Sequence, residues 1–280
     1  MKSSPFDHVF VDTVDQAVAL LADTSCYSKL LAGGQTLGPM MNLRLVHVER
    51  LVDISRIASL KEARVEEDDF VVGGGVRHCD FEDGTVGDAT QGLMRRVASG
   101  IAYRAVRNRG TIGGSLAHSD SAAEWPNVMA ALDAKVMLLG PKGTRTLPFA
   151  EFGHGALHTD LASDEIIVSV SLPQLSDDAR WGFHKECQKV GEFGEAIAVV
   201  VLDPARNLFS AVVGGVELFP RKLVNTSAYL FRAFYLREYV RDELLTAFHA
   251  DLQESNAQVD EYCRSLYGYS LDRAAREAFK

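Results

Sequence analysis

Cysteine is scarce in this sequence, with four in 280 residues, at positions 26, 79, 187 and 263. No two of them form a C-x-x-C pair, and no histidine cluster accompanies them. This spacing argues against a metal ion or an iron–sulfur cluster bound by the chain itself. It is typical of a reduced protein, and we therefore expect a cytoplasmic location.

Positive charge and long apolar runs are also in short supply. The 29 Lys and Arg are outnumbered by 38 Asp and Glu, which gives a formal charge of −9. An acidic chain of this kind is unsuited to the phosphate backbone of nucleic acid. The first residues lack the apolar segment of a signal peptide, and no apolar run reaches the roughly 18 residues of a membrane-spanning helix. We expect no membrane span.

Several signature motifs are missing as well. The sequence contains neither the G-x-S-x-G of a nucleophile elbow nor the H-E-x-x-H of a zinc protease. It also lacks the G-x-G-x-x-G of a Rossmann fold and the G-x-x-x-x-G-K-[ST] of a P-loop. No catalytic residue is therefore assigned, and any dinucleotide must be bound by another fold.

What the chain does contain is an apolar segment that ends in a glycine pair. Leu30, Leu31 and Ala32 read as the end of a buried strand, and Gly33-Gly34-Gln35-Thr36-Leu37 follow. Glycine adopts positive φ without a Cβ clash, so successive backbone N–H groups can converge on an anion. A tight turn without a ligand is the other interpretation of such a pair.

The same pattern returns at Arg109-Gly110-Thr111-Ile112-Gly113-Gly114-Ser115. Two such loops on one chain can hold the two phosphates of a dinucleotide. We expect Gly33, Gly34, Gly113 and Gly114 to line the pyrophosphate, so Gly114→Val should abolish retention of the dinucleotide. The glycine triplet at 73–75 has two interpretations, a third anion-binding loop or a bulge with close backbone packing, and we favour the second. His78 is interpreted as an ordinary residue.

Residues 32–45 and 107–118 resemble the two FAD loops of a known family, the FAD-binding medium subunits of molybdenum hydroxylases, such as carbon monoxide dehydrogenase. The flavin domain of xanthine dehydrogenase is a relative. The resemblance runs the length of the chain. It implies an α+β fold, with a two-lobed PCMH-type FAD-binding domain and a C-terminal antiparallel sheet with helices.

The resemblance also implies residues outside the two loops. Residues 119–126 match a family segment whose last carboxylate binds the ribityl hydroxyls, here Glu124, although Ser121 replaces the usual Pro. Ile167 matches a residue that packs on the flavin, and Lys185 a lysine beside the isoalloxazine ring. Phe193 and Gln188 depart from the family's Tyr and Arg. The FAD-binding residues expected in all are Leu31, Ala32, Gly33, Gly34, Gln35, Thr36, Leu37, Thr111, Ile112, Gly113, Gly114, Ser115, Glu124, Ile167 and Lys185.

We expect an FAD-binding domain at 1–175, with lobes at about 1–56 and 57–175, and a C-terminal domain at 176–280. A capping box at Thr13–Gln16 predicts the start of the first helix. Further helices are predicted over 93–98, 101–106 and 124–132, from 227 onward and over 271–278. Strands are predicted over 135–139 and 165–172, and then an antiparallel sheet from 181–189, 196–202 and 209–213. Arg107 or Arg109 could lend charge to the pyrophosphate, although a solvated basic face is the commoner reason for such arginines.

Three hypotheses follow from these residues. The first, carried by the resemblance, is an electron-transfer subunit of a molybdenum hydroxylase. Its partners would be a large molybdopterin subunit and a small [2Fe–2S] subunit, assembled as a dimer of heterotrimers, with electrons passing to an external acceptor. The second is a self-sufficient FAD-dependent oxidoreductase of the same fold. The third is a non-catalytic nucleotide-binding or scaffold module. The substrate and the electron acceptor cannot be read from this chain.

Overall fold

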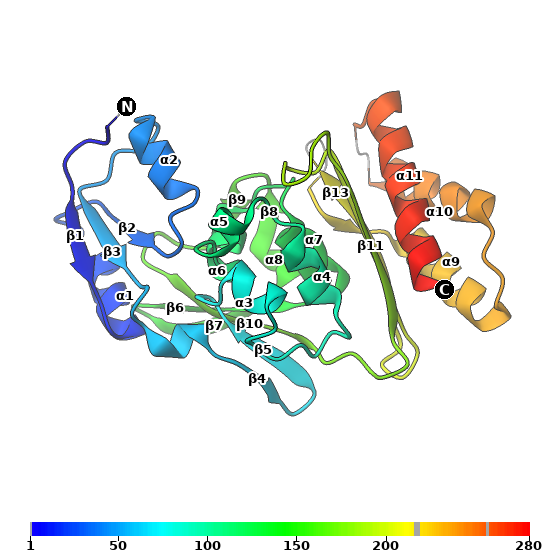
Figure 1. The fold of residues 1–280 in the computed structure, drawn as a ribbon, viewed down its shortest axis with the longest axis horizontal. Helices are drawn as coiled ribbons and strands as arrows, with labels where there is room; N and C mark the ends of the chain where they lie inside the picture. Colours follow the sequence, from blue (N-terminus) through cyan, green and yellow to red (C-terminus); the bar gives the residue numbers. More distant parts are fainter. Residues whose placement is uncertain (1, 216–218, 256–257) are drawn as a thin grey trace.

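The computed structural model describes residues 2–215, 219–255 and 258–280. Its first lobe holds a three-stranded parallel sheet in the order β1-β3-β2, formed by β1 (Asp7–Phe10), β3 (Arg50–Asp53) and β2 (Ser28–Leu31). Helix α1 (Val14–Ala22) connects the first two strands along the chain. The predicted capping box is confirmed, because Thr13 Oγ1 accepts a hydrogen bond from Gln16 N at 3.2 Å and Gln16 Oε1 accepts one from Thr13 N at 3.3 Å. Helix α2 (Leu37–Asn42) lies between β2 and β3 in the chain and above the sheet in Figure 1.

A five-stranded antiparallel sheet forms the centre of the molecule. Its order is β4 (Ala63–Glu66), β5 (Asp69–Gly73), β10 (Ile166–Pro173), β6 (Lys135–Gly140) and β7 (Gly143–Pro148). A short 3-10 helix, η1 (Ala58–Lys61), leads into it. The helices that cover it are α3 (His78–Glu82), α4 (Leu93–Ser99), α5 (Arg104–Arg107), α6 (Ile112–His118), α7 (Glu124–Ala131) and α8 (Phe149–Phe152), followed by the hairpin β8 (Gly153–Gly155) and β9 (His158–Thr159).

A second antiparallel sheet lies on the other side of these helices, as Figure 1 shows. Its order is β11 (Arg180–Glu186), β12 (Ala196–Asp203), β13 (Leu208–Gly215) and β14 (Arg221–Lys222). The far face of this sheet is covered by α9 (Val224–Leu236), α10 (Arg241–Glu254) and α11 (Glu261–Ala278). Because helices cover both faces, every residue of β12 and β13 is buried. This double burial explains why both strands read as almost continuous apolar runs.

The predicted α+β class, with two FAD-domain lobes and a C-terminal antiparallel sheet with helices, is confirmed. Several boundaries were wrong. Residues 101–103 are not helical, and α5 begins only at Arg104. Strand β11 ends at Glu186 rather than at 189. Helix α9 begins at Val224 rather than at 227. Helix α11 begins at Glu261, because Asp260 caps it by accepting from Cys263 N, and the glycine at 268 does not end it.

Candidate functional site

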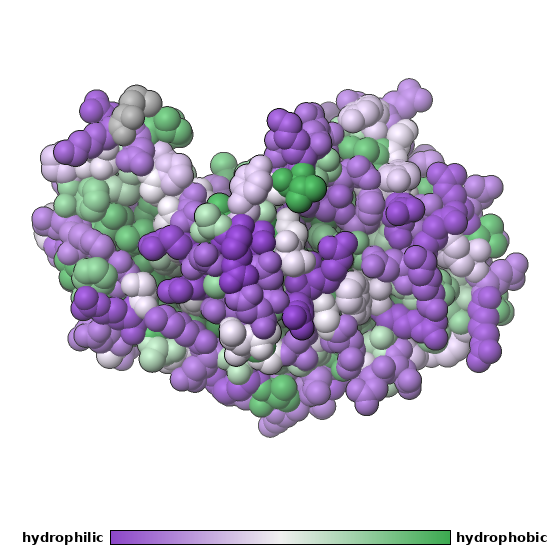
Figure 2. Space-filling view, in the orientation of Figure 1, coloured by the Kyte–Doolittle hydropathy of each residue, from purple (hydrophilic) through white to green (hydrophobic). Residues whose placement is uncertain are grey.

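One cavity of about 560 Å³ lies where the lobes meet, and both glycine loops line it. On the face seen in Figure 2, the surface is hollowed between the first lobe and the rest of the molecule. Residues 191–193, which follow β11, also reach the cavity wall. The residues predicted to bind FAD that line it are Leu31, Ala32, Gly33, Gly34, Gln35, Thr36, Leu37, Thr111, Gly113, Gly114, Ser115, Glu124 and Ile167.

The first glycine loop, residues 32–37, presents donors that the protein does not use. In the described part of the chain, the backbone N–H groups of 33–37 have no protein acceptor. Gly34 has a φ of +70°, the left-handed conformation that favours glycine. Thr36 precedes α2, but its side chain makes no capping hydrogen bond. The loop therefore offers a row of free donors suited to an anion such as a pyrophosphate.

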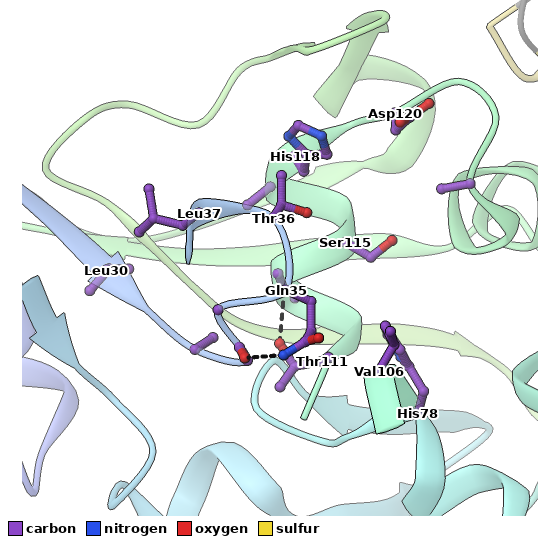
Figure 3. A pocket seen from close by; sticks show the side chains of 18 of the residues that line it. Leu30, Gln35, Thr36, Leu37, His78, Val106, Thr111, Ser115, His118 and Asp120 are labelled. Atoms are coloured by element: carbon purple, nitrogen blue, oxygen red, sulfur yellow. Dashed lines mark hydrogen bonds between the residues drawn. The ribbon is translucent and has the colours of Figure 1, made fainter. Parts of the chain in front are cut away.

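The second glycine loop, residues 109–115, is different in kind. Thr111 is the N-cap of α6, and its Oγ1 accepts from Gly114 N at 3.1 Å. Ile112 N donates to Val76 O at 3.0 Å, Gly113 N to Gly74 O at 2.9 Å and Ser115 N to Thr111 O at 3.0 Å. The expected second nest of convergent free N–H groups is thus not formed, because Gly113 and Gly114 are helical and their donors are occupied. Thr111 and Ser115 both line the cavity. Figure 3 shows the Thr111 hydroxyl bound to the α6 backbone and the Ser115 hydroxyl pointing away from that helix.

The glycine triplet at 73–75 supports the second loop, as its interpretation as close packing predicted. An added Cβ at Gly113 would lie 2.6 Å from Gly74 O, so only glycine allows this approach. Gly75 N is itself bound to Leu60 O at 2.7 Å. The triplet is a backbone platform rather than a third anion site.

The two loops also touch each other. A Cβ at Gly33 would overlap the carbonyl oxygen of Arg109. Arg109 Nε lies 3.4 Å from Gly33 O, and Gln35 Nε2 donates to the same oxygen at 3.1 Å. In the chain as described, no carboxylate forms a salt bridge with Arg109. This guanidinium is therefore the one of the two candidate arginines whose charge is available near the first loop.

Arg107 has a different task. Its guanidinium forms a bidentate pair with Glu82, at 2.7 and 2.9 Å, and this pairing lowers the pKa of Glu82. Its Nη1 donates at 2.9 Å to both Ile101 O and Ala102 O. Ile101 and Ala102 line the cavity. Arg107 thus fixes the cavity wall at residues 101–102 and is paired with Glu82.

Glu124 and Lys185 form a buried ion pair at 2.7 Å, with side chains 6% and 8% exposed. Burial raises the pKa of Glu124, and the Lys185 ammonium opposes that rise. The same ammonium donates at 3.0 Å to Gly100 O and Glu192 O. Lys185 was predicted beside the flavin, but it does not line the cavity and its three N–H groups are all in use. It ties β11 to α7, to the end of α4 and to the 191–193 segment.

Ile112 was also predicted at the site and does not line the cavity either. It is fully buried, as is Leu116 one helical turn later, because both face the core from α6. Conversely, His78 lines the cavity although it was interpreted as ordinary. The one signal in the sequence was its place three residues after the glycine triplet.

The chain belongs to the family described as the FAD binding domain in molybdopterin dehydrogenase, whose model matches residues 4–175. It is 37% identical to the 6-hydroxypseudooxynicotine dehydrogenase complex subunit alpha of Paenarthrobacter nicotinovorans, over 72% of this chain and 69% of that protein. It is 34% identical to the caffeine dehydrogenase subunit beta of a Pseudomonas species, over the same shares. Its fold matches a carbon monoxide dehydrogenase structure from Hydrogenophaga pseudoflava with a TM-score of 0.89 and 29% identity, covering 100% of this chain and 99% of that one.

The chain is therefore an FAD-binding subunit of the molybdenum hydroxylase type, and its class is oxidoreductase. The cavity suits FAD on its own evidence, since it is lined by free N–H donors and lies where glycines without a Cβ let the two loops approach each other and the platform closely. Among the described residues, no group of three or more His, Cys, Asp or Glu side chains is placed to hold a metal ion. No described helix is long and apolar enough to cross a membrane.

Proposed function

We propose that this chain is the electron-transfer subunit of a molybdenum hydroxylase complex. It would pass electrons from the [2Fe–2S] clusters of a small subunit, reduced by a large molybdopterin subunit, to an external acceptor. The observation that carries the proposal is the meeting of the two glycine loops, 76 residues apart in sequence, at one cavity. The family match and the subunit names of the relatives support the partner arrangement, proposed as a dimer of heterotrimers.

The residues of this chain would bind and orient the cofactor. The free N–H groups of 33–37 would hold the pyrophosphate. The Arg109 guanidinium, which lies 3.4 Å from Gly33 O but does not line the cavity, would add its positive charge from beside the first loop. The hydroxyls of Thr111 and Ser115 would complete that site from the second loop. The Glu124 carboxylate lines the cavity and would accept from the ribityl hydroxyls with the lone pairs that Lys185 leaves free. Ile167 would pack on the ring.

Bound FAD would supply the redox chemistry, and the protein needs no acid or base of its own for it. Lys185 would act on the ring only indirectly, by holding residues 191–193 at the cavity wall. At that wall Phe193 is 63% exposed, which leaves an apolar surface at the opening of the cavity. The proposal places the complex in the cytoplasm, which cell fractionation would test.

The test is purification of the complex through an affinity tag on this chain, expressed in its own host. We expect flavin absorption, FAD as the released chromophore, and molybdenum and iron in stoichiometric amounts with two further chains. A yellow protein that isolates alone and oxidises a substrate unaided would favour the self-sufficient oxidoreductase. A colourless complex that takes up no added FAD would overturn both of these functions.

A further inference from the structure

His78 is a buried side chain with an unused donor at the cavity. It is the first residue of α3 and is 5% exposed. Its backbone N donates to Gly110 O at 3.0 Å, which fixes it beneath the second glycine loop. A Cβ built on Gly110 would lie 2.7 Å from Nε2. His78 and Gly110 both line the cavity, and Figure 3 shows His78 at its wall beside Val106.

The protonation of the ring follows from its partner. Trp125 Nε1 lies 3.0 Å from His78 Nδ1, and both side chains are buried. An indole N–H is a donor only, so Nδ1 must be the unprotonated, accepting nitrogen. The neutral ring therefore carries its proton on Nε2. Burial, helped by the positive charge of Arg107, lowers the pKa of His78 to about 4 and keeps the ring neutral near pH 7.

The Nε2–H group has no acceptor among the described residues, although the rest of the His78 side chain is packed and paired. The residue is buried, but the Nε2 atom itself is open to the cavity, so its donor is available to a ligand bound there. The Nε2–H group of His78 lies next to Gly110, between two parts of the proposed FAD site. Thr111, in the second loop, follows Gly110, and Glu124, assigned to the ribityl chain, precedes Trp125.

We propose that His78 donates a hydrogen bond from Nε2 to an oxygen of bound FAD, in the stretch that joins the pyrophosphate to the ribityl chain. This inference rests on the proposed FAD site and adds a binding residue to it. Trp125 has the role of a positioning residue, since it selects the tautomer that can donate. A neutral donor suits this stretch because hydroxyl and phosphate oxygens both accept from it.

Two substitutions separate a role in binding FAD from a role in core packing. His78→Asn places an amide oxygen near the position of Nδ1, so it keeps an acceptor for Trp125 and removes the donor at Nε2. His78→Gln reaches further and supplies an amide N–H near the position of Nε2, but leaves Trp125 Nε1 unpaired. The proposal therefore predicts that His78→Asn is the more stable of the two variants but binds FAD more weakly. His78→Gln should be the less stable variant but bind FAD more tightly.

The measurement is FAD titration of the complex after its flavin has been removed, together with thermal unfolding of the same preparations. We expect His78→Asn to bind FAD about tenfold more weakly than wild type and His78→Gln to stay within about threefold. We expect His78→Gln to be the less stable of the two. If the less stable variant also bound FAD more weakly, or if His78→Asn bound FAD as tightly as wild type, the role of His78 would be overturned. The proposed FAD site would not be affected by that result. A wild-type complex that binds no FAD would overturn the proposed function and this inference with it.

Discussion

The two glycine loops share a sequence pattern, but their backbone N–H groups are free in the first loop and occupied in the second. In the first, Gly34 takes a positive φ and the backbone donors of 33–37 stay free, so the loop is built for a ligand. In the second, Gly113 lies against Gly74 and the donors of 112–115 are satisfied by the protein, so the loop is built on a platform. The comparison teaches that a glycine pair and a hydroxyl do not by themselves indicate free N–H groups. What distinguishes the loops is what the chain has placed behind them.

The largest effect should come from pushing the two loops apart. In Gly33→Ala, the new methyl group would overlap the Arg109 carbonyl, and both atoms belong to or adjoin the backbone, so neither can move aside cheaply. We expect FAD affinity to fall by at least about 100-fold, since the separation disrupts both halves of the site at once. FAD content of the purified protein and FAD titration would measure the loss.

The matched control is Gly38→Ala, five residues further along in α2, where an added Cβ meets nothing within 4 Å. It should bind FAD normally and gain up to about 1 kcal/mol in stability from the better helix former. A Gly33→Ala protein that keeps its full FAD content would show that contact between the loops is not needed.

Lowering the pH should destabilise the fold through His78, the residue that supports the second loop. His78 N is bonded to Gly110 O, and its ring has a pKa of about 4 when folded, against about 6.5 when unfolded. Between these values the unfolded chain binds the extra proton, so stability rises with pH there and is lost as pH falls below 6.5. From pH 7 to pH 5 this group alone should remove about 2 kcal/mol from the free energy of unfolding.

Urea unfolding of the FAD-free chain at both pH values would measure this loss, with His78→Asn as the control. Asp53, Glu82 and Glu165 have lowered pKa values and also weaken the fold in acid, but they do so in both proteins and cancel in the difference. Equal losses in the variant and the wild type would contradict the assignment to His78.

A side chain added to the second loop should have a smaller effect than one added to the first. At Gly114 a Cβ would lie 2.9 Å from Thr111 Oγ1, which belongs to a side chain that can rotate away. The structure therefore reduces the expected effect of Gly114→Val from complete loss to about a tenfold weakening of FAD binding. Gly87→Val, at a position with open space around the Cβ, should leave FAD titration unchanged. Complete loss of FAD in Gly114→Val would restore the view that the two loops are equivalent.

The sequence predicted local features well and contacts between distant segments poorly. The capping box at Thr13, the strand before Gly33 and the glycine triplet as packing could all be predicted, because their causes lie within a few residues. The pairing of Lys185 with Glu124 joins residues 61 apart, and that of Trp125 with His78 joins residues 47 apart. Such pairs depend on how the sheets pack around α4–α7, which no local pattern encodes.

Ile112 illustrates the same limit at the scale of one helix. Its place within the glycine motif suggested contact with FAD, but α6 starts at this residue and turns it toward the core. A helical period through Ile112 and Leu116 was visible in the sequence. The glycine pattern, which is shared with the first loop, suggested an extended turn instead. The division into domains at 175 remains a prediction.

The smallest and most discriminating effects should come from removing one hydroxyl group from each loop. Thr111→Val deprives Gly114 N of its acceptor, so we expect the FAD-free chain to lose about 1 kcal/mol of stability, as for other N-cap residues. Thr36→Val removes a hydroxyl that caps nothing. It should leave the stability of the FAD-free chain unchanged and weaken FAD binding about fivefold, as expected for one hydrogen bond to the ligand. Thermal unfolding without FAD, followed by FAD titration, would separate the two effects. If Thr36→Val destabilised the FAD-free chain as much as Thr111→Val does, the first loop would also depend on its own side chains, and the contrast between a loop built for the ligand and a loop built on the protein would fail.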